Sequence, residues 1–278
     1  MSLDLDSRQR AMLQEMGLRV WWPETVAAPP LAAAESAVVQ PLNTSPADLT
    51  PVPSPSRGPV VVAAPADVLA LPDGIAGMDW TALAQSVAQC QACKLCLGRR
   101  GAVFGAVPRQ ADWLVVGEPP DDSEERLGSP FAGQAGQLLD NMLKAVGVSR
   151  SGVVGDATDR ASAAYVTNVV KCRPSPPRNP QPQELAACEN YLRRELALVQ
   201  PKVILALGRF AAQTLLQGSV PGVAGIPLGK LRGQIHRYQG IPVVVSYHPA
   251  YLLRTPQDKA RAWADLCLAL AAVKSAGL

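Results

Sequence analysis

The sequence predicts an α/β fold, a three-layer αβα sandwich in which helices cover both faces of a central, mostly parallel sheet. From Asp79 onward, short apolar runs alternate with amphipathic helical stretches, which is the pattern of a parallel sheet connected by helices. The apolar content of 48% supplies enough side chains for a full core. A length of 278 residues accommodates one such domain together with additional segments.

The expected elements follow in chain order. Asp79 is a suitable N-cap for a helix whose apolar face begins at Trp80. Thr255 followed by Pro256 marks the start of the last helix, which we expect to run to about residue 274. The remaining expected strands are 113–116, 164–170, 203–207 and 242–247, and the remaining helices are 138–146, 184–199 and one from 210.

Two segments precede this domain, which we place at residues 79–278. Residues 26–78 contain ten of the 26 prolines and no aromatic residue, so they cannot bury enough apolar surface to fold, and we expect a disordered Pro/Ala-rich linker. Residues 1–25 contain a short amphipathic helical pattern that stops at Gly17 and is followed by two tryptophans. Aromatic anchors on a short helix are typical of a partner-binding peptide.

Composition limits the class of protein. No run of 18 apolar residues occurs and the N-terminus is polar, so we expect a soluble, cytoplasmic monomer with no membrane contact. Six cysteines in such a chain argue against a disulfide framework and favour metal binding or buried thiols. The net charge of +3 is concentrated after residue 78, because both preceding segments are acidic. A modestly basic domain is compatible with a polyanionic partner without identifying one.

Polar residues stand at the carboxyl ends of three predicted strands. Gly117-Glu118 follows the first, Asn168 lies at the end of the second, and His248 follows the last. Each alone is compatible with an ordinary loop position. Because ligands bind at the carboxyl ends of strands in open parallel sheets, the three together predict a site.

The cysteines suggest a second site. Cys90 and Cys93 lie one turn apart, and Cys172 and Cys188 form a distant second pair. Four thiolates can hold a tetrahedral zinc or an iron–sulfur cluster, and the spacing does not separate these alternatives. With only two histidines in the chain, mixed Cys/His zinc sites are disfavoured. Cys96 could replace one of the four, but we interpret Cys96 and Cys267 as buried, small apolar residues.

Five segments in order carry a resemblance to one known family. They are Cys90-x-x-Cys93-x-Leu95; Gly117-Glu118-x-Pro120 followed by Gly128-x-Pro130-Phe131-x-Gly133-x-Ala135-Gly136; Thr167-Asn168-x-x-Lys171-Cys172-Arg173-Pro174; Cys188; and His248-Pro249-Ala250-x-Leu252-Leu253-Arg254. This order resembles the family-four uracil-DNA glycosylases, iron–sulfur enzymes of bacteria and archaea, over about two thirds of the chain. The resemblance implies the uracil-DNA glycosylase-like fold and a monofunctional DNA repair enzyme. Such an enzyme flips uracil out of DNA, hydrolyses its N-glycosidic bond and leaves an abasic site.

The resemblance also implies a cofactor and the roles of individual residues. Cys90, Cys93, Cys172 and Cys188 would ligate a [4Fe–4S] cluster. Glu118 would orient the attacking water and stabilise positive charge on the sugar, and His248 would donate toward uracil O2 as negative charge develops on the leaving base.

Four matched residues would bind the base. Gly117 belongs to the first motif, and Phe131 resembles the ring on which uracil stacks. Asn168 would donate its NH₂ to O4 and accept from N3–H. Glu124 would form a wall against the thymine methyl group, and a solvated loop glutamate is the alternative.

The segment from His248 to Arg254 resembles the loop that enters the minor groove of uracil-containing DNA. Leu253 would be the wedge that fills the gap left by the flipped nucleotide, and Arg254 would contact a phosphate. Gly208-Arg209, at a strand end, could present backbone N–H groups to another phosphate.

Two departures from the family pattern open an alternative. The family reads Gly-Glu-Ala-Pro-Gly where this chain has Pro119 and Asp121, which stiffens the turn and adds a charge, so activity could be reduced. The alternatives are a replication-associated DNA-binding module with a degenerate glycosylase site and a zinc-stabilised DNA-binding protein. Residues 8–23 resemble the N-terminal peptide of the clamp-loader psi subunit, which implies the clamp-loader chi subunit as a partner.

Overall fold

The computed structural model describes residues 74–105, 110–151, 153–154, 157–158 and 162–275. The predicted peptide 1–25 and the predicted linker up to residue 73 lie outside these residues. Within the expected linker, residues 74–78 are folded: Ile75 is buried in the short 3₁₀ helix η1 (Ile75–Gly77), and the Met78 carbonyl accepts a hydrogen bond from Arg194 Nε at 2.6 Å. The boundary expected at residue 79 is therefore too late.

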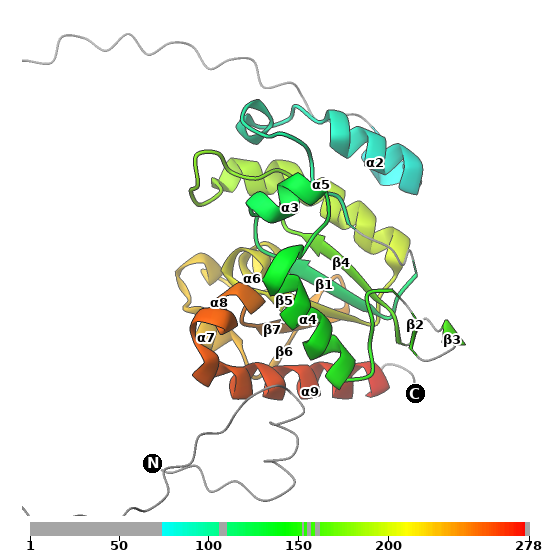
Figure 1. Ribbon diagram of the computed structural model, residues 1–278, viewed down its shortest axis with the longest axis vertical. Helices are drawn as coiled ribbons and strands as arrows, with labels where there is room; N and C mark the ends of the chain where they lie inside the picture. The colour runs from blue at the N-terminus through cyan, green and yellow to red at the C-terminus, as the bar shows by residue number, and fades with distance from the viewer. Residues whose placement is uncertain (1–73, 106–109, 152, 155–156, 159–161, 276–278) are drawn as a thin grey trace, which may run out of the picture. The chain divides into compact units, whose positions relative to one another are not determined.

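A five-stranded sheet forms the centre of the domain, in the order β4-β1-β5-β7-β6 (Figure 1). The strands β1 (Trp113–Gly117), β4 (Ala164–Asn168), β5 (Val203–Leu207) and β7 (Ile241–Ser246) pair in parallel, as predicted. The edge strand β6 (Ile235–Tyr238) runs antiparallel to β7. A separate two-stranded ladder joins β2 (Val153–Val154) and β3 (Ala157–Thr158).

Strand β6 was not predicted, although the Gln239-Gly240 pair that follows it is compatible with a hairpin turn. Gln239 and Gly240 connect β6 to β7 with φ values of 49° and 85°. Two consecutive residues with positive φ are typical of a tight two-residue hairpin turn. The burial of β6 alternates between exposed and half-buried positions, so the strand lacks the apolar run that marks the buried strands.

Helices connect the strands and cover both faces of the sheet (Figure 1). Asp79 caps the first of them, accepting from the Ala82 N–H at 2.8 Å. Pro256 begins a 3₁₀ turn that precedes the last helix. The helices are α2 (Trp80–Gln89), η2 (Lys94–Leu97), α3 (Asp122–Leu127), α4 (Gly133–Ala145), α5 (Pro182–Val199), α6 (Arg209–Leu216), η4 (Val223–Gly225), α7 (Leu228–Leu231), α8 (Pro249–Arg254), η5 (Pro256–Asp258) and α9 (Lys259–Ser275).

Two apolar cores, one on each face of the sheet, confirm the three-layer architecture. Leu114 and Val116 of β1 pack in the core that contains residues of α2, α5 and α6. Trp113 and Val115, which point to the opposite face, pack in the core that contains residues of α4, α8 and α9. Within the part of the chain that the structure describes, no helix is both long and apolar enough to cross a membrane.

A buried ion pair connects the end of β4 to α5. Lys171 Nζ lies 2.5 Å from Glu195 Oε2, and the two side chains are 2% and 0% exposed. Lys171 Nζ also donates to Thr167 Oγ1 at 2.6 Å and to the Asn168 carbonyl at 2.9 Å, while Glu195 accepts from the Tyr165 hydroxyl at 2.8 Å. The network therefore ties the carboxyl end of β4 to the helix beneath it.

Removing the cation of this pair should be costly. Lys171→Met leaves the Glu195 carboxylate buried without its counter-charge, and we expect the free energy of unfolding in urea to fall by about 3–5 kcal/mol. The control is Arg193→Met, which removes the exposed ion pair with Glu189 on the same helix and should cost less than about 1 kcal/mol. Equal losses in the two variants would contradict a special role for the buried pair.

Candidate functional site

The parallel register brings the predicted strand-end residues to one edge of the sheet. Gly117 at the end of β1 pairs with Asn168 at the end of β4. Gly208 follows β5 directly, and His248 follows β7 after one intervening residue. The carboxylate, amide and imidazole that were predicted to converge therefore stand at the carboxyl ends of β1, β4 and β7, which are parallel strands of one sheet.

Gly117 provides the space in which an aromatic ring and an amide meet. A Cβ atom at Gly117 would lie 2.5 Å from Phe131 Cζ and 3.0 Å from Asn168 Oδ1. Phe131 is 2% exposed and Asn168 is 1% exposed. The ring and the amide are thus packed against the bare backbone of Gly117, and any side chain there would displace them.

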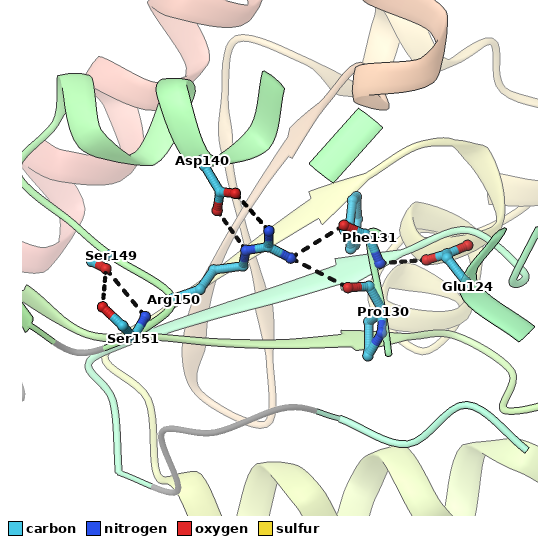
Figure 2. A network of polar contacts seen from close by, with 7 residues as sticks. All are labelled: Glu124, Pro130, Phe131, Asp140, Ser149, Arg150 and Ser151. Carbon is cyan, nitrogen blue, oxygen red and sulfur yellow. Dashed lines mark hydrogen bonds and ion pairs between the residues drawn. The ribbon is translucent and has the colours of Figure 1, made fainter. Parts of the chain in front are cut away.

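The Phe131 backbone has an unusual conformation. Its φ of 51° is left-handed, which costs a residue other than glycine about 1–2 kcal/mol. The Phe131 N–H donates to Glu124 Oε1 at 2.5 Å, and its carbonyl accepts from Arg150 Nη1 at 3.3 Å (Figure 2). Contacts on both sides of the residue therefore hold the strained conformation in place.

Glu124 orients the Asn168 side chain. Glu124 lies on α3 and is 7% exposed, so the solvated loop glutamate considered as an alternative is wrong. Its Oε1 accepts from Asn168 Nδ2 at 3.1 Å. Among the described residues, Asn168 Oδ1 is buried and has no hydrogen-bond partner. The amide therefore presents an unpartnered acceptor inside the site.

The carboxylate of Glu124 is held by several donors. Burial raises its pKa, while N–H groups of Asp121, Asn168 and Phe131 oppose that shift by hydrogen bonding to the carboxylate. The backbone N–H of Asp121 donates to Glu124 Oε2 at 2.8 Å.

Asp121, which stands where the family pattern has glycine, is the N-cap of α3. Its Oδ1 accepts from the Glu124 N–H at 2.9 Å, and Glu124 reciprocates, which completes a capping box. The departure from glycine thus supplies an N-cap, and the added negative charge lies at a helix N-terminus, where it is favourable.

His248 stacks on Phe131, with ring centroids 5.0 Å apart and an interplanar angle of 25°. His248 Nδ1 accepts from the Ala250 N–H at 3.2 Å, so His248 also caps α8. Burial, assisted by the nearby positive charge of Arg254, lowers the pKa of His248 to about 4. The ring is therefore neutral near pH 7, and because Nδ1 is an acceptor, Nε2 carries the proton and can donate it.

Glu118 follows β1, and its side chain reaches the start of α6. Its Oε1 accepts from the Phe210 N–H at 2.7 Å, and a Cβ at Gly208 would lie 2.3 Å from the same oxygen. Burial raises the pKa of Glu118 to about 7, although the backbone donors at this helix start lower it. A carboxyl group that titrates near neutral pH is suited to accepting a proton from water.

One part of the phosphate contact expected at Gly208-Arg209 requires correction. The Gly208 N–H donates to the Ser246 carbonyl at 3.0 Å, so it already has an acceptor within the protein. The contact expected from the Arg209 N–H stays a prediction. The Arg209 side chain is exposed, with its guanidinium carbon 4.6 Å from the centroid of the Phe210 ring.

The segment after His248 is a short helix, α8, and not the expected loop. The helix separates two adjacent leucines: Leu252 is 1% exposed and packs in the core, whereas Leu253 is 42% exposed. Arg254 is also exposed. Leu253 and Arg254 therefore face solvent beside the site, where a large partner could reach them.

The two cysteine pairs line one cavity. Its walls also include Cys96, which is half-buried and not fully buried as expected. Cys267 is exposed on α9, so the expectation that it is a buried, small apolar residue is wrong. The complete lining is Val87, Cys90, Ala92, Cys93, Cys96, Lys171, Cys172, Ala187, Cys188 and Tyr191.

The cavity is lined by sulfur ligands. Cysteine thiolates are the usual ligands of iron–sulfur clusters and are also common ligands of zinc. Arg99 Nη1 donates to Cys172 Sγ at 2.9 Å, and the Lys171 N–H donates to Cys188 Sγ at 3.3 Å. Hydrogen bonds to the sulfur atoms are a feature of cluster sites.

Sequence reasoning missed the contacts that support the site. Arg99 contacts Cys172, and Arg150 contacts Phe131. Each pair is far apart in sequence, so no local sequence pattern predicts these contacts. The capping box between Asp121 and Glu124 was open to prediction, because an acidic residue followed three positions later by glutamate is a recognised helix start.

Comparison with known proteins gives consistent matches. The family model described as the uracil DNA glycosylase superfamily matches residues 104–267. The type-4 uracil-DNA glycosylase of Thermotoga maritima is 35% identical over 182 residues, covering 64% of this chain and 85% of that protein. The type-4 enzyme of Pyrobaculum aerophilum is 35% identical over 195 residues, covering 69% and 93%. A type-5 uracil-DNA glycosylase of Thermus thermophilus is 32% identical over 161 residues, covering 50% and 73%.

Proposed function

Because this chain belongs to the type-4 branch of the uracil DNA glycosylase superfamily, we propose that it removes uracil from DNA by hydrolysing the N-glycosidic bond. The observation that carries the proposal is the convergence of Glu118, Phe131, Asn168 and His248 at one edge of the sheet. The products are free uracil and an abasic site. The alternative of a degenerate binding module is not favoured, since the Asp121 carboxylate caps α3.

Uracil is recognised by a preset amide. With one Nδ2 hydrogen donated to Glu124, Asn168 directs Oδ1 to accept from uracil N3–H and its second N–H toward O4. Cytosine has an acceptor at N3 and a donor at position 4, so the same amide orientation opposes it. Glu124 thus selects uracil by fixing Asn168, in addition to any contact with a methyl group.

Bond cleavage uses the two titratable residues. Neutral His248 donates its Nε2 proton in a hydrogen bond to uracil O2 as the base departs with negative charge. The Glu118 carboxylate orients the water and stabilises positive charge on the sugar. Phe131 supports the base from one face.

The cysteine cavity is proposed to hold a [4Fe–4S] cluster through Cys90, Cys93, Cys172 and Cys188. When bound, the cluster joins the two cysteine pairs and stabilises the fold. The donor set and the two hydrogen bonds to cysteine sulfur support this assignment. In the same proposal Leu253 fills the gap left by the flipped nucleotide, and Arg254 contacts a phosphate of the DNA.

Two finer proposals rest on the sequence alone. Docking of residues 8–23 on the clamp-loader chi subunit would hold the enzyme near replication forks and raise its local concentration there. A cytoplasmic monomer is the state in which we expect the enzyme to act.

The direct test is single-turnover cleavage of an oligonucleotide with one uracil, placed opposite guanine, opposite adenine or unpaired. We expect alkali-sensitive breaks at uracil with anaerobically purified protein, and rates lower by about 10²–10³-fold for Asn168→Ala and His248→Ala, which each remove a preorganised hydrogen bond. Arg193→Met, far from these residues in sequence and exposed, is the control. Tight binding of uracil DNA without breaks would favour the binding module.

The pKa values predict the pH dependence of the cleavage step. The Glu118 carboxyl is protonated below about pH 7, so the single-turnover rate should rise with pH through about 7 and be about tenfold below its plateau at pH 6. Protonation of His248 should matter only toward pH 4. The profile is measured at constant ionic strength. In Glu118→Gln the inflection near pH 7 should disappear, and its persistence would assign it to another group.

Cysteine variants test the cluster. We expect the purified wild-type protein to contain iron and sulfide and to absorb visible light, and Cys172→Ser to lose most of both together with stability. Cys96→Ser, in the same cavity wall, should retain them. Iron and sulfide analysis with absorption spectra provides the measurement. Stoichiometric zinc, or iron lost only in Cys96→Ser, would refute the proposed ligand set.

A further inference from the structure

Arg150 makes a contact with the site that the proposed reaction does not use. It precedes β2 and reaches the backbone of the loop between α3 and α4, close to the start of α4 (Figure 2). Nη1 of Arg150 donates to the carbonyls of Pro130 and Phe131, each at 3.3 Å. The side chain therefore contacts both peptide groups that flank the Phe131 Cα atom.

Asp140 fixes the direction of the guanidinium. Arg150 Nε and Nη2 donate to Asp140 Oδ1 and Oδ2, each at 2.6 Å (Figure 2). This two-point contact uses one edge of the planar fork and leaves Nη1 directed at the two carbonyls. Asp140 lies on α4, the helix that begins two residues after Phe131. A lysine could not reproduce the arrangement, because a single ammonium group lacks the fork.

The guanidinium lies on the side of Phe131 opposite Glu124. Glu124 holds the Phe131 N–H and Arg150 holds its carbonyl, so the residue with φ of 51° is fixed at both ends. The same carbonyl packs closely on α4: a Cβ at Gly136 would lie 1.7 Å from the Phe131 oxygen. The direction of the ring depends on this backbone conformation.

The exposure of the ion pair argues against a mainly stabilising role. The side chains of Arg150 and Asp140 are 25% and 48% exposed, and ion pairs with this degree of exposure add little to stability. The two-point contact with Asp140 nevertheless directs Arg150 at the backbone of Phe131. The Phe131 ring in turn stacks on His248 and packs beside Asn168 at Gly117.

We propose that Arg150, oriented by Asp140, is a positioning residue that holds the Phe131 ring in the direction required to support the flipped uracil. The inference rests on the proposed function and adds to it a residue that does not touch the substrate. Arg150 acts through the Phe131 backbone, so its effect must depend on the Phe131 ring.

The test is a double-mutant cycle in the full-length protein. Arg150→Met, Asp140→Asn and Phe131→Leu are made singly, and the first two are combined with Phe131→Leu. Arg150→Lys is the conservative variant, and Arg193→Met removes an equally positive, exposed side chain elsewhere. For each protein we measure the single-turnover rate at saturating enzyme, the Kd for uracil DNA and for uracil-free DNA, and the melting temperature.

A positioning role gives a specific pattern. Arg150→Met and Asp140→Asn should each lower the saturated cleavage rate by about 10- to 100-fold, since small misplacements at a reacting centre have effects of this size. Arg150→Lys should recover little of the loss. Affinity for uracil-free DNA should change no more than in Arg193→Met. In the Phe131→Leu background, the Arg150 and Asp140 substitutions should lower the rate by less than about twofold.

Other outcomes overturn the inference. Effects that multiply fully in the double variants show that Arg150 acts independently of Phe131. Tighter DNA binding by Asp140→Asn, with weaker binding by Arg150→Met, identifies a phosphate contact. A fall in melting temperature with an unchanged cleavage rate identifies a structural role. Wild-type protein that releases no uracil refutes the proposed function itself, whereas active wild type with active Arg150 variants refutes only this inference.

Discussion

The ion pair between Lys171 and Glu195 is the interaction on which both sites depend. Its position is decisive: Lys171 lies between Asn168, whose carbonyl it binds, and Cys172, which lines the cysteine cavity. Burying two charges is costly unless each finds partners, and here Thr167 and Tyr165 complete the set. Between Asn168 and Cys172 the chain therefore leaves the sheet, places the Asn168 amide at the sheet edge and enters the cavity wall.

Next to this ion pair, the residues at the edge of the sheet constrain one another's positions. The parallel register places Gly117 beside Asn168. The missing side chain of Gly117 admits the Phe131 ring, and Glu124 then binds both the Phe131 N–H and the Asn168 amide. Most of these contacts join groups that are nearly excluded from water, where hydrogen bonds are strong and unpaired polar atoms are costly. The unpartnered Asn168 Oδ1 is therefore informative, because among the described residues no protein donor satisfies this buried acceptor.

The parts of the fold and site that could be predicted are those that depend on residues close together in the sequence. The helix after Asp79, the strand beginning at Trp113 and the approach of Glu118, Asn168 and His248 follow from caps, apolar runs and the topology of parallel sheets. Periodicity did not reveal α8 or the edge strand β6, since one is short and the other half-exposed.

The contacts between distant segments were beyond local pattern. The hydrogen bond from Arg99 to Cys172 and the reach of Arg150 to Phe131 join residues far apart in sequence, so only the assembled fold reveals them. The use of Glu124 to orient Asn168 likewise depends on α3 packing beside the end of β4. Residue types at strand ends thus predicted where the site lies, while its orientation depended on tertiary contacts.

The glycines that border the site limit how its specificity can change. Gly117 touches the Phe131 ring, Gly208 touches Glu118, and Gly136 touches the Phe131 carbonyl, each closer than any side chain allows. Divergence that keeps these three glycines can therefore alter the site only through its side chains, such as Asn168 and Glu124, because the close backbone contacts leave no room for added Cβ atoms.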